Sequence, residues 1–145
     1  MYTYYEAHRK RGKEAVDDIN IISNFTGTAV GDCWKTYHQY SNCNDALCSA
    51  HILRELNGIS ELENQKLSHS MKNLLLEIKK ESDLSWNTGN SLTIDKIESF
   101  KKRYAKILAN GFKEDYIANS ESYSKKKSKK STSLNLTDRL SGYND

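Results

Sequence analysis

The sequence predicts an α/β fold over its first third and helices over the rest. Short apolar segments alternate with helix-period segments up to about residue 50, whereas every apolar pattern after His51 has helical spacing. A strand-helix-strand-helix-strand order favours parallel pairing of the last two strands. We therefore expect about three strands with their helices, followed by a helical subdomain.

The elements of the first third are separated by polar turns. Tyr2–His8 is rich in aromatic residues, which favours a strand. The other expected elements, in chain order, are a helix at Lys13–Ile22, a strand at Thr28–Val30, a short helix at Cys33–Tyr40 and a strand at Ala46–Ala50.

After His51 the apolar residues form stripes that each predict an amphipathic helix. The first three stripes are Ile52, Leu53, Leu56 and Ile59; Leu67, Met71, Leu74, Leu75 and Ile78; and Ile94, Ile97, Phe100, Tyr104, Ile107 and Leu108. A fourth, shorter helix is expected around Phe112–Tyr123, and another at residues 134–140.

Length and composition limit the class of protein. The 145 residues suffice for one modest domain, 28% of them are charged, and the formal net charge is +3. No apolar run approaches the ~18 residues that span a bilayer, and no hydrophobic signal segment opens the chain, so we expect no membrane partner. Three cysteines without a secretory signal favour free thiols in the reducing cytoplasm.

Asp32 is the first candidate for chemistry, because it directly follows a short apolar strand. A carboxylate at a strand end is a potential Mg²⁺ ligand, and two carboxylate-held metals activate the attacking and leaving oxygens of a phosphodiester. One carboxylate does not suffice for that reaction. The alternative is that Asp32 caps the helix expected at Cys33–Tyr40.

These residues and their flanks resemble the transposases of the insertion sequence 66 family, bacterial enzymes with a ribonuclease-H-like DDE domain. The matching segments are HRKRGKEAVDDINIISNFTGTAVGDCWKTYHQY (His8–Tyr40), ALCSAHILREL (Ala46–Leu56), MKNLLLEIKK (Met71–Lys80) and SLNLTDRL (Ser133–Leu140). The resemblance implies DNA as partner, phosphoryl transfer as reaction and Asp32 as the second, Mg²⁺-binding Asp of the triad. Gly31 stands where the family usually has His.

The resemblance also implies a division of the chain. Residues 1–56 correspond to part of the ribonuclease-H-like catalytic core, 57–123 to the helical insertion and 124–145 to a flexible basic tail or truncated continuation. The first Asp and the final Glu of the triad have no counterpart here, so we expect a fragment that is inactive alone and holds Mg²⁺ weakly. The alternative is a non-catalytic DNA-binding or dimerisation remnant, which pairs with itself or with a full-length transposase.

Cys48 and His51 form a Cys-x-x-His motif next to the last expected strand. A zinc site would need four ligands, for which Cys33, Cys43 and His38 are the remaining candidates, at irregular spacing. We favour packing for Cys48 as a small apolar residue, and a structural role for His51 beside the active site.

Basic residues supply the candidate DNA contacts. Lysine and arginine side chains neutralise phosphates in a salt-dependent way, but a solvated surface would show the same pattern. The resemblance argues against Glu55 as the third carboxylate of the triad. The ordinary alternative is a surface ion pair between Arg54 and Glu55. The candidates for DNA binding are Arg9, Lys10, Arg11, Lys13, Arg54, Lys125, Lys126 and Lys127.

Three aromatic residues follow Asp32 at near-helical spacing: Trp34, Tyr37 and Tyr40. Exposed aromatic side chains can stack on bases of single-stranded nucleic acid. Beside a strand such residues belong more often to the core, and we predict a core role for all three.

Overall fold

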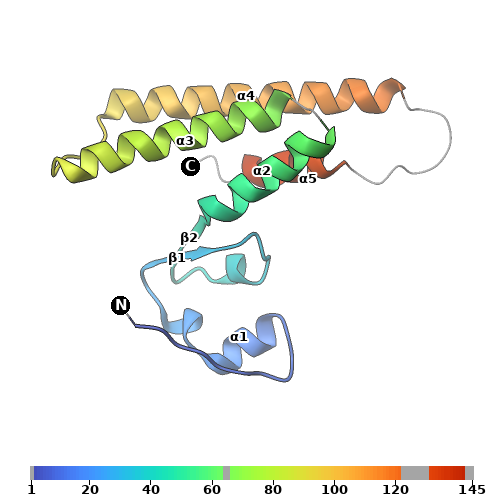
Figure 1. Cartoon of the computed structure of the whole chain (residues 1–145). Coiled ribbons are helices and arrows are strands. Elements are labelled where there is room, and N and C mark those ends of the chain that lie inside the picture. The colour runs from blue at the N-terminus through green and yellow to red at the C-terminus, as the bar shows by residue number, and fades with distance from the viewer. Residues whose placement is uncertain (1, 64–65, 122–130, 143–145) are drawn as a thin grey trace. The chain divides into compact units, whose positions relative to one another are not determined.

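The computed structural model describes residues 2–63, 66–121 and 131–142. The chain is mostly helical and divides into two compact units, Met1–His51 and Ile52–Asp145. Its elements (Figure 1) are α1 (Lys13–Ile19), the 3₁₀ helix η1 (Ile22–Asn24), β1 (Thr28–Gly31), the 3₁₀ helix η2 (Tyr37–Gln39), β2 (Asn44–Leu47), α2 (Ser49–Glu63), α3 (Lys66–Asn87), α4 (Ile94–Glu121) and α5 (Thr132–Ser141).

The first unit contains a parallel sheet of two strands. β1 and β2 pair in register from Thr28 opposite Asn44 to Gly31 opposite Leu47, which confirms the predicted parallel pairing. The Cys48 N–H donates to the Gly31 carbonyl at 2.7 Å and extends the ladder past β2. The carboxyl ends of both strands therefore lie at one edge of the sheet.

Tyr40 connects α1 to the segment before β2. Its ring is buried, and its hydroxyl donates to Oδ1 of Asp17 at 2.6 Å. The Lys13 ammonium binds the same carboxylate at 2.7 Å and lies 5.0 Å from the centre of the Tyr40 ring. Ala15 is buried on the same helix. These contacts form the small core of the first unit.

Three predicted elements of the first unit are corrected by the structure. The strand expected at Ala46–Ala50 is instead Asn44–Leu47, because α2 already begins at Ser49. Tyr2–His8 is not a strand: no described segment pairs with it, and Tyr2 and Tyr5 are 103% and 90% exposed. A strand needs a partner for its backbone groups, and aromatic composition alone does not supply one. Cys33–Tyr40 forms only the three-residue η2, because so short a segment gains too few hydrogen bonds to offset helix nucleation.

In the second unit α3 and α4 form an antiparallel hairpin (Figure 1). Arg103 binds Glu77 through two hydrogen bonds of 2.7 and 2.6 Å, and the Lys96 ammonium contacts Glu81 nearer the turn. The turn includes Gly89, whose φ of 69° is a backbone conformation that residues with a Cβ rarely adopt.

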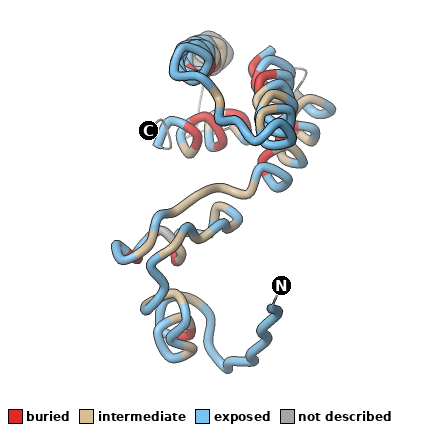
Figure 2. The backbone as a smooth tube through the Cα atoms, turned by 90° about the vertical axis from the view of Figure 1, so that its left-hand side faces the viewer, coloured by how far each residue is buried: buried red, intermediate tan, exposed pale blue. Residues whose placement is uncertain are grey.

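The core of the second unit lies among its four helices. Figure 2 shows the buried residues gathered on these helices. α5 starts with a Ser131 cap that accepts the Leu134 N–H, and the Tyr104 hydroxyl of α4 donates to the Leu140 carbonyl at 2.9 Å. The buried apolar side chains are Ile52, Leu56, Ile59, Leu67, Met71, Leu74, Phe100, Leu108, Leu136 and Leu140.

The helical stripes predict this core in large part, with two differences. Ile94 and Ile97 are 75% and 41% exposed, so the first turns of α4 add no buried apolar side chain to the core. The helix expected separately at Phe112–Tyr123 is instead the end of α4, which continues without a break to Glu121. Residues 122–130, which include the lysine run, lie outside the described part of the chain.

Candidate functional site

The candidate site lies at the carboxyl edge of the β1–β2 pair. Because Gly31 is opposite Leu47, the next residues, Asp32 and Cys48, lie beside each other at this edge. His51 follows in the first turn of α2, and its N–H donates to the Cys48 carbonyl at 3.0 Å. The structure thus brings together Asp32 and the Cys-x-x-His motif.

The Asp32 side chain is exposed and shapes the turn after β1. Its Oδ1 accepts the Trp34 N–H at 3.2 Å, two residues further on. This is the hydrogen bond of an Asx turn. The alternative prediction, that Asp32 caps a helix, is therefore wrong, because no helix starts here. The carboxylate does accept a backbone N–H, as a cap would.

Gly31 is explained by the ring of Tyr37. A Cβ at position 31 would lie 3.1 Å from Cδ2 of Tyr37, so the ring would have to shift by a few tenths of an ångström to admit it. Trp34 meets Tyr37 edge to face, with centroids 5.0 Å apart and the planes at 85°. Tyr40 is buried as predicted, whereas Trp34 stays 36% exposed.

Cys48 and His51 interact through their side chains. The pKa of the Cys48 thiol lies below its ordinary value of 9.0, chiefly because the His51 side chain hydrogen-bonds to it. The backbone N–H groups of His51 and Ala50 at the start of α2 act in the same direction, while partial burial opposes them. Cys48 is half-buried and is thus more than the apolar packing residue that we expected.

The described residues do not fit a complete metal site. Among them, no three His, Cys, Asp or Glu side chains gather where they would hold an ion together. No disulfide joins Cys33, Cys43 or Cys48. The His38 side chain lies outside the described part of the structure. Asp32 is therefore a single carboxylate at a strand edge, which is too few ligands for two-metal chemistry.

The basic residues before and at the start of α1 differ in their pairing. Lys10 and Lys13 bind carboxylates one helical turn away, Glu14 at 2.5 Å and Asp17 at 2.7 Å. Arg9 and Arg11 are exposed and have no carboxylate partner among the described residues. The two arginines are the cations of this group that are open to a ligand.

Arg54 is exposed on α2, and its expected pairing with Glu55 does not form. Glu55 instead binds Arg139 of α5. The sequence carries no signal for this pair, since 84 residues separate the two side chains. Lys125, Lys126 and Lys127 lie outside the described residues.

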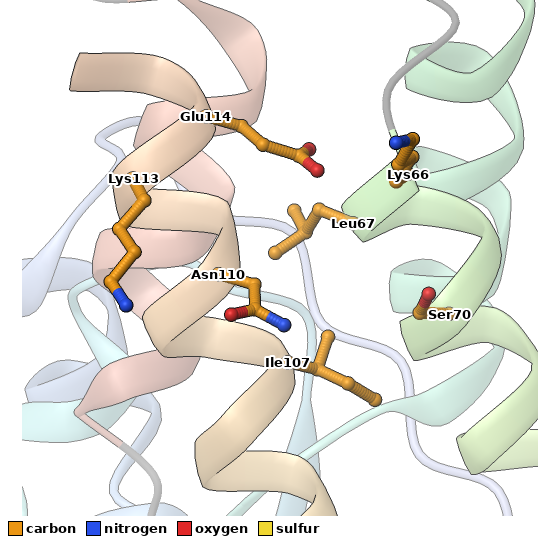
Figure 3. A pocket seen from close by; sticks show the side chains of 7 residues that line it. All are labelled: Lys66, Leu67, Ser70, Ile107, Asn110, Lys113 and Glu114. Atoms are coloured by element: carbon orange, nitrogen blue, oxygen red, sulfur yellow. The ribbon is translucent and has the colours of Figure 1, made fainter. Parts of the chain in front are cut away.

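A groove between α3 and α4 is a feature that the sequence analysis missed. It has a volume of about 400 Å³ (Figure 3). Its lining consists of Lys66, Leu67, Ser70, Ile107, Asn110, Lys113 and Glu114.

A family model described as "Transposase IS66 family" matches residues 1–142. The chain belongs to this family. No curated protein and no solved structure matches it. Membership in the IS66 transposase family confirms the resemblance seen in the sequence and gives DNA as the general kind of partner. Within the described residues, no helix combines the length and the apolar character needed to cross a membrane.

Proposed function

We propose that this IS66-family chain is part of a DDE-type unit that cuts and joins DNA strands when an insertion sequence transposes. The proposal is carried by the position of Asp32 at the common carboxyl edge of two parallel strands in a member of a transposase family. In α/β sheets this edge is where ligands usually bind. Residues 1–56 are then part of a ribonuclease-H-like core, residues 57–123 are its helical insertion, and 124–145 are a basic tail or continuation.

The roles of the site residues follow from this proposal. Asp32 is the catalytic carboxylate and would ligate Mg²⁺ only together with further carboxylates. Cys48 and His51 lie beside it, where the hydrogen bond from His51 orients the thiol. Because the described residues bring no second and third ligand to Asp32, we propose that the chain alone holds Mg²⁺ weakly and is inactive as an enzyme.

A strand-cleavage assay tests the inactivity. The purified chain is incubated with Mg²⁺ and duplex DNA that carries the ends of an insertion sequence, and no nicked or joined product is expected. Product that disappears in Asp32→Ala would overturn the proposal of inactivity, although it would support the catalytic role of Asp32.

A metal titration tests the role of Asp32 directly. Mn²⁺ in place of Mg²⁺ broadens the NMR signals of nearby nuclei, and we expect broadening around Asp32 and Cys48 at millimolar metal. Asp32→Asn should remove it. Broadening that is unchanged in this variant, or that centres on the carboxylates of α1, would contradict the assignment of Asp32.

The alternative is a non-catalytic remnant that binds DNA or pairs with itself or with a full-length transposase. Arg9 and Arg11, exposed and unpaired among the described residues, favour its DNA-binding form. Arginine contacts to phosphates weaken steeply as salt rises. In a salt titration of DNA binding, Arg9→Gln with Arg11→Gln should flatten the slope. An unchanged slope would remove this segment from the DNA interface.

A further inference from the structure

The three cysteines of the chain all lie in the first unit, as free and partly exposed thiols. Cys43 directly precedes β2, and Cys48 directly follows it. Cys33 lies two residues after the end of β1. Partial exposure lets small oxidants reach each thiol. Their places along the two strands therefore decide which thiols can pair.

Cys33 and Cys48 lie at the same edge of the sheet. Gly31 is opposite Leu47, and the hydrogen bond of 2.7 Å from the Cys48 N–H to the Gly31 carbonyl keeps the two segments adjacent at Cys48. Cys33 is thus one residue beyond the position opposite Cys48. The strand spacing of ~4.8 Å and the rise of ~3.3 Å per residue place the two Cα atoms about 6 Å apart. Disulfides join Cα atoms about 4.4–6.8 Å apart.

The turn after β1 separates Cys33 from the regular alternation of side chains along the strand. Oδ1 of Asp32 accepts the Trp34 N–H at 3.2 Å, and the backbone bends at Cys33 between them. In a continuous strand, neighbouring side chains point to opposite faces of the sheet. Because the strand has already ended, this alternation does not keep the Cys33 thiol on the face away from Cys48.

Cys43 lies at the opposite edge of the sheet. The Asn44 N–H donates to the Gly27 carbonyl at 2.9 Å, so the ladder also fixes the segment next to Cys43. Five residues of extended chain separate Cys43 from Cys48, which corresponds to ~16 Å. That distance is more than twice the reach of a disulfide. While the sheet is intact, Cys43 has no cysteine within reach at either edge.

We propose that Cys33 and Cys48 are a reversible oxidation site, in which a peroxide joins the two thiols by a disulfide and thiol reductants separate them again. The structure describes the reduced form. The site depends only on the register of the sheet, so it goes beyond the proposed function and does not need it.

The reaction with hydrogen peroxide takes place in two steps. One cysteine thiolate attacks the peroxide, so that an S–O bond forms and the O–O bond breaks. The products are a sulfenic acid and a hydroxide, which takes up a proton and becomes water. The other thiolate then attacks the oxidised sulfur, so that the S–S bond forms and the S–O bond breaks. The second hydroxide also becomes water. Two electrons pass in total from the two thiols to one peroxide.

Peptide mapping tests the pairing directly. The reduced full chain is treated with hydrogen peroxide, its remaining thiols are alkylated, and it is digested without reductant. Trypsin cuts after Lys35, and an Asp-specific protease cuts before Asp45, so each cysteine lies in a peptide of its own. Mass spectrometry should find the Cys33 and Cys48 peptides joined, with the loss of two hydrogens, and dithiothreitol should separate them.

Two variants that each remove one thiol give matched controls. Cys43→Ser should form the same disulfide as the unaltered chain. Cys33→Ser should form no disulfide within the chain. A disulfide that contains Cys43 would overturn the inference, and so would the absence of any disulfide. Cys33 and Cys48 peptides joined only in a covalent dimer on a non-reducing gel would also overturn it.

Hydrogen exchange shows whether the disulfide fits the folded sheet. A cross-link restricts the unfolded chain, so amides of β1 and β2 should exchange at least roughly tenfold more slowly after oxidation of the unaltered chain. The same treatment should leave exchange in Cys33→Ser unchanged. Faster or equal exchange in the cross-linked chain would mean that the disulfide forms only in an opened sheet, which would contradict the proposed site.

Discussion

Cys48 occupies a position that changes the chemistry of its thiol. The His51 side chain and the first N–H groups of α2 stabilise the thiolate, so the pKa of the thiol falls below 9.0. Thiolates, not thiols, react with alkylating agents. Near neutral pH Cys48 should therefore react faster than an ordinary half-buried cysteine.

Replacing His51 tests this cause. His51→Ala removes the largest stabilising contact, so the pKa of Cys48 should rise and its alkylation by iodoacetamide near neutral pH should slow severalfold. Mass spectrometry of the peptides separates Cys48 from Cys33 and Cys43. The pH profile of alkylation should move to higher pH in the variant. If only Cys33 or Cys43 changed its rate, the contact would have no chemical effect.

Tyr40 gives the first unit a predictable response to alkaline pH. Burial and the hydrogen bond to Asp17 raise its pKa from 10.0 to about 12. The unfolded chain therefore loses this proton first, so the stabilisation is complete below pH 10 and disappears as pH rises towards about 12.

Tyr40→Phe should reduce that alkaline loss and cost about 0.5–1.5 kcal/mol at neutral pH for the missing hydrogen bond. A urea titration, followed by NMR signals of the first unit at neutral pH and between pH 10 and about 12, checks both effects. The same alkaline loss in the variant and in the unaltered chain would contradict the assignment to Tyr40.

At the scale of single elements, two glycines inside helices make opposite predictions. A Cβ at Gly111 of α4 would lie 2.1 Å from Cδ1 of Leu67, whose side chain is itself buried on α3. A Cβ at Gly58 of α2 would meet nothing within 4 Å. The first glycine is needed for helix packing, and the second only weakens its helix.

Gly111→Ala should therefore destabilise the second unit by about 1–3 kcal/mol through overpacking. Gly58→Ala should stabilise it by about 0.5–1 kcal/mol, because alanine favours the helix. Thermal unfolding followed by circular dichroism measures both. Stabilisation by Gly111→Ala would show that α4 can move away from Leu67 at little cost.

Whether a predicted helix or strand is correct depends on whether its backbone hydrogen bonds need a second segment of the chain. The stripes of α2 and α3 predict buried residues correctly, since an amphipathic helix carries its own hydrogen bonds and needs only an apolar surface. The strand at Tyr2–His8 fails, because a strand depends on a neighbour that its own residues do not specify. The break expected before Phe112 fails because Gly111 serves packing within a continuous α4.

Part of the candidate site is also predictable from the sequence. Parallel pairing aligns the ends of β1 and β2, so Asp32 and Cys48 become neighbours once the strands are recognised. The contact of Cys48 with His51 follows from three-residue spacing at a helix start. The pairing of Glu55 with Arg139 is not predictable, because it depends on where α5 packs.

At the scale of the whole molecule, the two units differ in how much they bury. Among the described residues, the first unit buries Ala15, Thr36 and Tyr40, whereas the second unit buries ten large or medium apolar side chains and three small polar ones. Buried apolar surface is the main source of stability. The first unit should therefore open more easily than the second.

Hydrogen exchange measured by NMR on the unaltered chain tests this difference. Amides of β1 and β2 should exchange roughly tenfold faster or more than those in the middle of α3, which corresponds to at least about 1.4 kcal/mol. Equal protection in both units would mean that the sheet gains stability from contacts beyond its own small core.

The close approach of Gly111 and Leu67 also restricts which substitutions this sequence can accept during evolution. The two positions are 44 residues apart in the chain, yet a Leu67 methyl group occupies the space that a Cβ at position 111 would need. A larger residue at position 111 fits best when a smaller residue replaces Leu67. Natural variants that keep the hairpin should therefore change these two positions together.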